Sequence, residues 1–384
     1  MAISIPDRGF IFWPVGTGDC TTIRIDENVF LQIDLRHMDK SEDDDDPAWP
    51  VIDELVDILP ISNKVPFLSV FALTHPDEDH CKGFTSLNER VFISQLWMSP
   101  RTFREYKEND DLCDDAAAFH KEAMRRVKAT IDAGGDPGSG NRIRIIGYDT
   151  LLSDAEFDGF PEEFLSIPGH TITQIDGADV SDSFSAFIHA PFKKDSYGDR
   201  NDCSLAFQIT LKSTDRVGQA LLMGDLKYPI VRRIFDASEQ DTLNWNIFLA
   251  PHHCSKSVMY WQDENDAKET LKADIVKDIG NAALDPGYVV ASSAPIPASN
   301  KAGDNPPHAK AKAEYERIVP NEFICTHEHP PGGDTQPVIF EVSDAGLSYV
   351  GDCESSESLD KTLKAVGGAA AIPATGTGFG SDAL

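Results

Sequence analysis

The stretch "LTHPDEDHCKG", residues 73–83, places two histidines and three acids within six consecutive positions. The apolar run at 67–75 that leads into it predicts a buried strand, so the polar side chains stand where that strand ends. Imidazole and carboxylate groups are common ligands of divalent metals, and the pattern therefore indicates a metal site. A solvated acidic loop is the alternative interpretation of this stretch taken alone. The four candidate ligands are His75, Asp77, Asp79 and His80.

Two more apolar strands end in residues of the same kind. The segment at 219–226, "QALLMGDL", delivers Asp225, and the segment at 246–253, "NIFLAPHH", delivers His252 and His253. Strand ends often carry functional residues, because the scaffold fixes them while the loops let side chains converge. Three strand ends that all supply metal-binding side chains favour a metal site over an acidic loop.

The remaining patterns predict an α/β fold, with period-two or apolar strands and helices of 3.6-residue period. Strands are expected within 10–35, 67–75, 143–149, 184–190, 204–211, 219–226, 246–253 and 288–294, helices at 51–59, 114–135 and 309–319, and a closing hairpin at 338–351. We expect one domain over residues 1–354 with a helical insertion at about 100–135. The Gly/Ala-rich tail over 355–384 is expected to be flexible.

The chain is strongly acidic, since 34 Lys and Arg stand against 64 Asp and Glu and give a formal net charge of −30. This field repels a polyanion at long range and argues against a broad surface that coats nucleic acid. A bound divalent metal reverses the sign locally, so cleavage of a phosphodiester at a metal centre stays compatible with the charge.

Several features indicate a cytoplasmic protein. No apolar stretch approaches the roughly 20 residues of a membrane-spanning helix, so no membrane partner is expected. The first ten residues, "MAISIPDRGF", lack the basic start and apolar run of a signal peptide. The seven cysteines are scattered and never form a C-x-x-C pair, which favours a reducing compartment.

Several segments of the chain together resemble the motifs of a known family. "HPDEDH" resembles the H-x-[HD]-x-D-H signature of the metallo-β-lactamase fold, and its Asp77 is similar to the variant found in the metallo-β-lactamase domain of the competence protein ComEC. Further segments resemble the family's motifs in the family's order, namely "VGTGDCTTI", "LQIDL", "NDCSLAFQI", "LLMGDL", "APHHCSKS" and "YVVASSA". The likeness covers about residues 10–351 and implies a four-layer αββα sandwich of two mixed sheets flanked by helices.

The resemblance also implies two divalent ions, zinc or manganese with magnesium possible. It assigns His75 and Asp77 to one metal and makes Asp225 the bridge. It assigns to the second metal the residues Asp79, His80 and one histidine of "PHH".

The histidine pair leaves a choice. We favour His252 as the ligand, because it ends the strand, with His253 as its neighbour or substitute. Asp19 and Asp34 are candidates for the second shell or for alternate ligands, and Asp19 is equally well a turn residue. Cys254 stands where the family has glycine, and we interpret it as an inert small side chain.

The family's third-motif histidine has no clear counterpart. His170 in "IPGHT" looks like that motif but precedes the segment that aligns best, where Asn201 and Asp202 stand. We favour Asp202, with Asn201 as an alternate, over His170. Fewer strong protein ligands would weaken metal binding and favour an oxygen-loving ion such as Mn²⁺ over Zn²⁺.

The catalytic candidates are Asp79, His308 and Lys256. His308 lies at a junction between a loop and a helix, where it serves either as a general acid or phosphate contact or only in structure. Lys256 follows the histidine pair, where it contacts a scissile phosphate or caps the next segment.

The fold serves many substrates and does not choose one by itself. The likeness to ComEC-type domains implies a nuclease or phosphodiesterase that hydrolyses DNA with a hydroxide activated by two metals. We expect a role in DNA processing or antiphage defence, with a regulatory protein as a further partner. The alternatives are a hydrolase of a small phosphoester such as a cyclic nucleotide, and a metal-poor regulatory or binding subunit.

Overall fold

The structure is a computed structural model, and it describes residues 3–38, 49–109, 112–148, 150–193, 200–264, 266–301, 303 and 305–352. The predicted flexible tail at 355–384 lies outside the described residues. Among the helices in these ranges, none has the length and apolar character needed to cross a membrane.

The first sheet has ten strands and mixes both pairing directions. Its order is β21 (Gly346–Tyr349), β20 (Val338–Ser343), β1 (Gly9–Phe12), β2 (Thr21–Arg24), β3 (Phe30–Ile33), β5 (Val65–Ala72), β6 (Phe92–Met98), β7 (Arg142–Ile146) and β8 (Leu165–Ser166), with β4 (Ile61–Ser62) paired to β5. The strands from β21 to β3 pair antiparallel, and those from β3 to β8 pair parallel. The closing hairpin expected at 338–351 therefore joins the first strands of the chain.

The second sheet has seven strands and is also mixed. Its order is β19 (Glu322–Cys325), β18 (Ala283–Ala291), β15 (Trp245–Leu249), β14 (Arg216–Leu222), β13 (Ala206–Ser213), β12 (Phe184–Ala190) and β9 (Thr171–Ile172). Parallel pairing runs from β14 to β19. Two small hairpins stand apart from both sheets, β10 (Gln174–Ile175) with β11 (Ala178–Asp179) and β16 (Tyr260–Trp261) with β17 (Thr270–Leu271).

Side chains alternate between two apolar layers along each central strand, because successive residues of a strand face opposite sides of a sheet. In β1, Phe10 and Phe12 enter the core between the two sheets, while Ile11 packs outward against helices. In β15, Ile247 also enters the core between the sheets, and Phe248 packs outward. Three separate apolar cores result, one between the sheets and one on each outer face.

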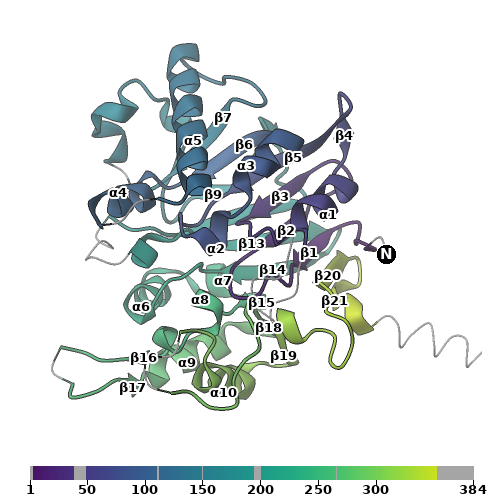
Figure 1. The fold of residues 1–384 in the computed structure, drawn as a ribbon, viewed down its shortest axis with the longest axis vertical. Coiled ribbons are helices and arrows are strands. Elements are labelled where there is room, and N and C mark those ends of the chain that lie inside the picture. Colours follow the sequence, from purple (N-terminus) through teal and green to yellow (C-terminus); the bar gives the residue numbers. More distant parts are fainter. Residues whose placement is uncertain are drawn as a thin grey trace, which may run out of the picture.

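Helices cover both outer faces, as Figure 1 shows with β5, β6 and β7 of the first sheet in its upper half. The first sheet carries α1 (Val51–Ile58), α3 (Phe84–Arg90), α4 (Pro100–Asn109) and α5 (Asp114–Ala133). The second sheet carries α6 (Tyr228–Ala237), α7 (Gln240–Leu243), α9 (Ala273–Asn281) and α10 (Ala309–Ile318). The predicted fold class, two mixed sheets flanked by helices in four layers, is confirmed. The helices expected about 100–135 are α4 and α5.

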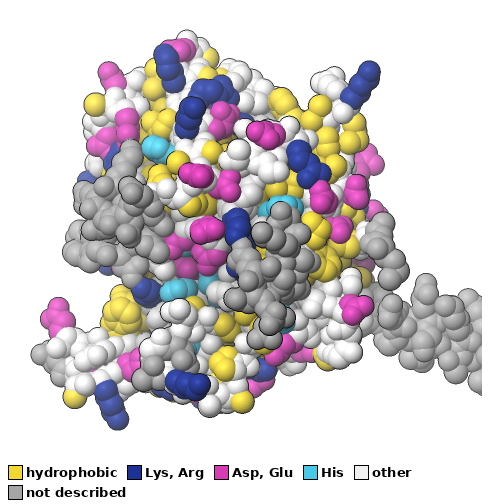
Figure 2. All heavy atoms as spheres, viewed as in Figure 1, with side chains coloured by type: hydrophobic (Ala, Val, Ile, Leu, Met, Phe, Trp, Pro, Cys, Tyr) yellow, Lys and Arg dark blue, Asp and Glu magenta, His cyan; other side chains and the backbone are white. Residues whose placement is uncertain are grey.

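The parallel strands of both sheets end on the same side of the molecule, where two short elements carry polar residues. These are α2 (Glu78–Cys81), which follows β5, and the turn α8 (Pro251–Cys254), which follows β15. Open α/β sheets place their functional residues at the carboxyl ends of parallel strands. Figure 2 shows acidic and histidine side chains gathered near the middle of this face.

Candidate metal centre

A buried carboxylate at the end of β3 orients the histidine of α2. Asp34 Oδ1 accepts a hydrogen bond from the backbone N–H of Thr74 at 2.7 Å, and Oδ2 accepts one from the Thr74 hydroxyl at 2.6 Å. Oδ2 also lies 2.7 Å from Nδ1 of His80, so Nδ1 carries the proton and donates it. This leaves the other ring nitrogen, Nε2, as the atom that can bind a metal once its proton is displaced.

Backbone contacts fix α2 itself against the start of the chain. The carbonyl of His80 accepts from the N–H of Leu35 at 2.8 Å, and the N–H of His80 donates to the Asp77 carbonyl at 3.0 Å. A Cβ at Gly18 would stand 2.6 Å from the backbone oxygen of Asp79, so only glycine lets this loop approach so closely. The "GTGD" loop thus packs directly on the helix that carries the candidate ligands.

The turn α8 has an unusual backbone. His252, His253 and Cys254 have φ values of +51°, +53° and +64°, a left-handed conformation that costs about 1–2 kcal/mol per residue outside glycine. Contacts on both sides hold the turn, because the N–H of His252 donates to the Gly224 carbonyl at 3.0 Å and the Cys254 carbonyl accepts from His308 at 3.1 Å. This turn projects the two neighbouring imidazoles to opposite sides of one carboxylate.

That carboxylate is Asp225, which is only 3% exposed. Its Oδ2 lies 3.6 Å from Nε2 of His75 and 3.6 Å from Nε2 of His252. Its Oδ1 lies 3.3 Å from Nε2 of His80 and 3.5 Å from Nε2 of His253. Each oxygen of Asp225 therefore faces its own pair of histidines.

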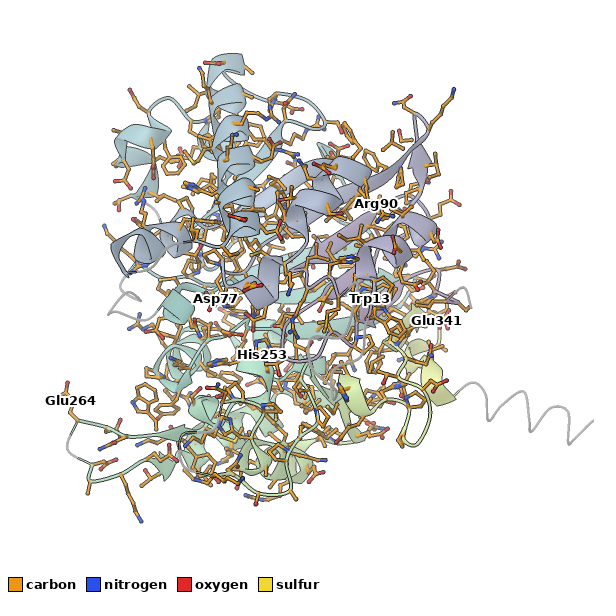
Figure 3. The ribbon with its side chains drawn as sticks, in the orientation of Figure 1. Trp13, Asp77, Arg90, His253, Glu264 and Glu341 are labelled. Atoms are coloured by element: carbon orange, nitrogen blue, oxygen red, sulfur yellow. The ribbon has the colours of Figure 1, made fainter. Side chains whose placement is uncertain are left out.

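Each of the two histidine pairs also has a further carboxylate close to it. Oδ2 of Asp77 lies 3.9 Å from Nε2 of His75, and Oδ2 of Asp79 lies 3.2 Å from Nε2 of His253. Asp19 contacts the far side of the His253 ring, with its Oδ1 3.4 Å from Nδ1. The sequence-predicted ligands Asp77 and Asp79 thus come from α2 and its preceding residue, and Figure 3 labels Asp77 above His253 where the two halves meet.

The cluster fits a metal by two tests. Nε2 of His75 and Oδ1 of Asp225 are buried atoms without a hydrogen bond inside the described part of the chain, and buried polar atoms ordinarily have a partner. Ligand atoms of Asp19, His80, Asp225 and His253 all lie within 4.8 Å of one another, and no other such group occurs among the described residues. The imidazole and carboxylate donors match zinc or manganese.

The acids and histidines of the cluster shift one another's pKa values because they lie close together. Burial acts to lower the pKa of His80 and His253, but Asp225 and its neighbouring acids outweigh this effect and raise both well above their ordinary value. Burial acts to raise the pKa of Asp225, and the surrounding histidines lower it well below its ordinary value. The pKa of Asp79 is lowered in the same way, against burial, by His80 and His253. A metal that binds here displaces protons from imidazoles.

Two catalytic candidates, His308 and Lys256, have partners in the elements beside the cluster. His308 is buried, and its Nδ1 accepts a hydrogen bond from the backbone N–H of Lys256 at 3.2 Å. The ammonium of Lys256 binds both oxygens of Glu269 at 2.8 and 2.9 Å. His308 therefore supports the turn that carries the histidines, and Lys256 anchors the β16–β17 hairpin.

The three candidates for the third motif lie in two places. Asn201 and Asp202 belong to the short turn η4 (Arg200–Cys203), and the Asn201 carbonyl accepts from the hydroxyl of Ser204. The N–H of Asp225 lies 3.4 Å from that hydroxyl, so this turn supports the bridging residue. His170 is exposed, and its carbonyl accepts from Ile188 at the far edge of the second sheet.

Sequence reasoning did not single out two residues that support the cluster. Thr74 donates twice to Asp34, and the carbonyl of Ser292 accepts from Nδ1 of His253 at 3.1 Å. The Ser292 hydroxyl also donates to the Gly18 carbonyl at 2.5 Å, which joins the two sheets. The only sequence signal for either residue is its position directly after a strand, which the candidate ligands share.

Comparison with known proteins gives structural neighbours only, because no protein-family model and no curated sequence matches the chain. The metallo-β-lactamase fold protein YhfI from Bacillus subtilis is similar with a TM-score of 0.40 and 10% identity over 86% of this chain and 99% of its own. Zn²⁺-bound PqqB from Methylobacterium extorquens is similar with a TM-score of 0.37 and 9% identity over 84% of this chain and 87% of its own. A diphosphatase from the PhnP family is similar with a TM-score of 0.34 and 8% identity over 84% of each chain. At such scores and identities the likeness concerns the fold alone. The strand order of the two sheets and the distances within the cluster are properties of this chain itself.

Proposed function

We propose that the protein is a divalent-metal-dependent hydrolase of phosphodiesters and that DNA is its substrate. The observation that carries the proposal is the position of Asp225, whose two oxygens each face a separate pair of histidines. A carboxylate with ligands on both sides is suited to bridge two metals, the arrangement used for in-line displacement at phosphorus.

The geometry suggests a division of ligands between two ions, zinc or manganese. The first ion would be held by His75, Asp77, His252 and Oδ2 of Asp225. The second would be held by Asp79, His80, His253 and Oδ1 of Asp225. Compared with the assignment expected from the sequence, His253 takes the place of His252 at the second ion, and His252 supplies the first. His252 thereby fills the place left by the missing third-motif histidine.

Such ions supply Lewis-acid chemistry that activates water and polarises a phosphoryl oxygen. The protein supplies orientation, because Asp34 holds His80 and the Ser292 carbonyl holds His253. It also determines the side of approach. The side chains of Asp79 and His252 are 34% and 19% exposed, whereas the other three histidines of the cluster are buried, so substrate reaches the cluster over these two residues.

Support for DNA comes from the ordered motifs that resemble a ComEC-type domain. The net charge of −30 gives no general attraction for a polyanion, and it favours a second candidate, a small phosphoester such as a cyclic nucleotide. Both candidates use the same centre and differ in the size of the substrate, so a substrate panel separates them.

The test compares two neighbouring residues of α2. Asp79→Asn removes a candidate ligand, while Glu78→Gln alters an exposed acid whose carboxylate pairs with Lys82 at 3.5 Å. The full chain, loaded with Zn²⁺ or Mn²⁺, is assayed against linear and circular DNA, RNA, cyclic nucleotides and bis(4-nitrophenyl) phosphate. We expect DNA cleavage that falls at least about 100-fold in Asp79→Asn and is unchanged in Glu78→Gln. Inertness of the metal-loaded wild type toward the whole panel would contradict the proposal.

A further inference from the structure

Two cysteines meet at the outer end of the helix that carries Asp79 and His80. Cys81 is the last residue of α2, and Cys113 directly precedes α5. Their sulfur atoms lie 3.5 Å apart, and both thiols are free. Cys81 is fully buried, whereas Cys113 is partly exposed and open to a small reagent from solvent.

Further contacts hold the two segments together. Asp115, in the first turn of α5, accepts the backbone N–H of Gly83 at 2.7 Å and that of Thr85 at 2.9 Å. The start of α5 is therefore clamped to the chain on the far side of Cys81. In Figure 1, α2 and α3 lie beside α5 on the same outer face. The sulfurs meet because the surrounding backbone holds them in place.

We propose that Cys81 and Cys113 are an oxidation site, at which hydrogen peroxide forms a reversible disulfide that weakens metal binding by α2. The Cys113 thiolate attacks one peroxide oxygen, the O–O bond breaks, and Cys113 sulfenic acid and hydroxide form. The Cys81 sulfur then attacks the Cys113 sulfur, the S–O bond breaks, and water leaves with the Cys81 proton. The two thiols lose two electrons in total, and peroxide is reduced to water.

The surroundings of the sulfurs assign these roles. The hydrogen bond between the two thiols, aided by the backbone at Ala116 and opposed by partial burial, lowers the pKa of Cys113 to about 7. Cys81 is buried, and its thiol donates to the Asp77 carbonyl at 3.2 Å. A partly exposed, readily ionised cysteine beside a buried thiol is the arrangement of a peroxide-sensitive cysteine with its resolving partner.

Formation of the disulfide displaces the candidate ligands because Cys81 lies next to them in the chain. A disulfide has a sulfur separation of about 2.05 Å, so the sulfurs must close by about 1.5 Å. Cys81 follows His80 directly and shares a single helical turn with Asp79. Metal–ligand distances tolerate only about 0.2 Å, so we expect the disulfide to weaken metal affinity about 10- to 100-fold, as other changes around ligands do. This coupling rests on the proposed metal function, whereas the disulfide itself does not.

The experiment uses the full chain with Zn²⁺, which does not itself react with peroxide. The protein is treated with hydrogen peroxide, remaining thiols are alkylated, and the unreduced digest is mapped by mass spectrometry. Zinc affinity is measured in parallel by competition with a chromophoric chelator. We expect a Cys81–Cys113 linked peptide to form first, zinc affinity to fall about 10- to 100-fold, and a phosphine reductant to reverse both.

Matched variants separate this site from general oxidation. Cys113→Ser is expected to lose both the linked peptide and the effect of peroxide on zinc affinity, and Cys325→Ser, which alters another buried cysteine, is expected to keep both. The wild-type map decides the matter even when a variant does not fold. Cys113 recovered as an unlinked sulfinic acid, or oxidised protein with the zinc affinity of reduced protein, would overturn the proposal. Failure of reduced protein to bind zinc would instead count against the proposed function, while the map still tests the disulfide.

Discussion

Replacing Asp34 by asparagine changes one acceptor oxygen of a buried side chain into an amino group. In the wild type the two oxygens accept three hydrogen bonds, from the N–H and hydroxyl of Thr74 and from Nδ1 of His80. When the remaining oxygen of asparagine stays with the Thr74 N–H, its amino group faces Nδ1. Nδ1 must then accept, and the ring proton moves to Nε2, the atom that faces Asp225 at 3.3 Å. A protonated Nε2 cannot bind a metal.

The size of the effect follows from that tautomer change. Loss of a carboxylate that orients a metal-binding histidine costs about 10- to 100-fold in metal affinity, or about 1.4–2.8 kcal/mol. The metal-free fold also loses a hydrogen bond to a charged group, so we expect its free energy of unfolding to fall by about 1–3 kcal/mol. Both quantities are measurable in the same variant.

The assay is competition for Zn²⁺ with a chromophoric chelator, together with urea unfolding in the presence of excess chelator. Asp26→Asn is the matched control, because Asp26 Oδ1 also accepts two backbone N–H groups, from Asn28 at 2.8 Å and Val29 at 2.9 Å, in a surface turn. The control should bind zinc within about twofold of the wild type. If Asp34→Asn also stays within about twofold, the account of how His80 is oriented is refuted.

Three further results are expected. The raised pKa values of His80 and His253 mean that the metal-free protein binds extra protons, which a metal must displace. At pH values below these pKa values, metal affinity should therefore fall about tenfold for each unit that the pH is lowered and for each proton displaced. Chelator competition at several pH values measures this dependence. A metal affinity that does not change with pH would contradict this expectation. By the same linkage, His80 and His253 stabilise the metal-free fold at pH values below their ordinary pKa, and that stability should be lost as the pH rises through their raised pKa values. Gly18→Ala puts a methyl group 2.6 Å from the Asp79 backbone oxygen and should cost about 1–3 kcal/mol in urea unfolding, whereas Gly135→Ala, with open space around it, should stay within about 0.5 kcal/mol. Equal stability of these two variants would argue against the close approach.

The fold and most of the cluster could be predicted because their signals are local. An apolar run that ends in His75, and another that ends in Asp225, indicate both the strand and the position of the polar residue. These two strands belong to different sheets, and their ends meet because the two sheets pack together with their parallel strands ending on the same side. The strand and helix patterns likewise predict an α/β fold, and the resemblance to the metallo-β-lactamase fold implies the two sheets flanked by helices that are observed.

The partition of the histidines could not be predicted, because it depends on backbone angles. Position along the strand favours His252 as the partner of His80, but the left-handed turn directs His253 there. Glycine is the usual sequence signal for such backbone angles, but this turn has a cysteine, Cys254, in place of a glycine. The partner of Lys256 was equally inaccessible, because Glu269 arrives from a separate hairpin that only the folded chain brings close.

The carboxylate of Asp225 serves two ligand sets, and the metal content of the protein tests this most directly. The full chain is loaded with Zn²⁺ or Mn²⁺, freed of excess metal and analysed for elemental composition alongside Asp225→Ala. We expect about two ions per wild-type chain and at most about one in the variant, since a bridging carboxylate belongs to both sites. A wild type that retains no metal, or an Asp225→Ala protein that retains two ions, would contradict a bridging role for Asp225.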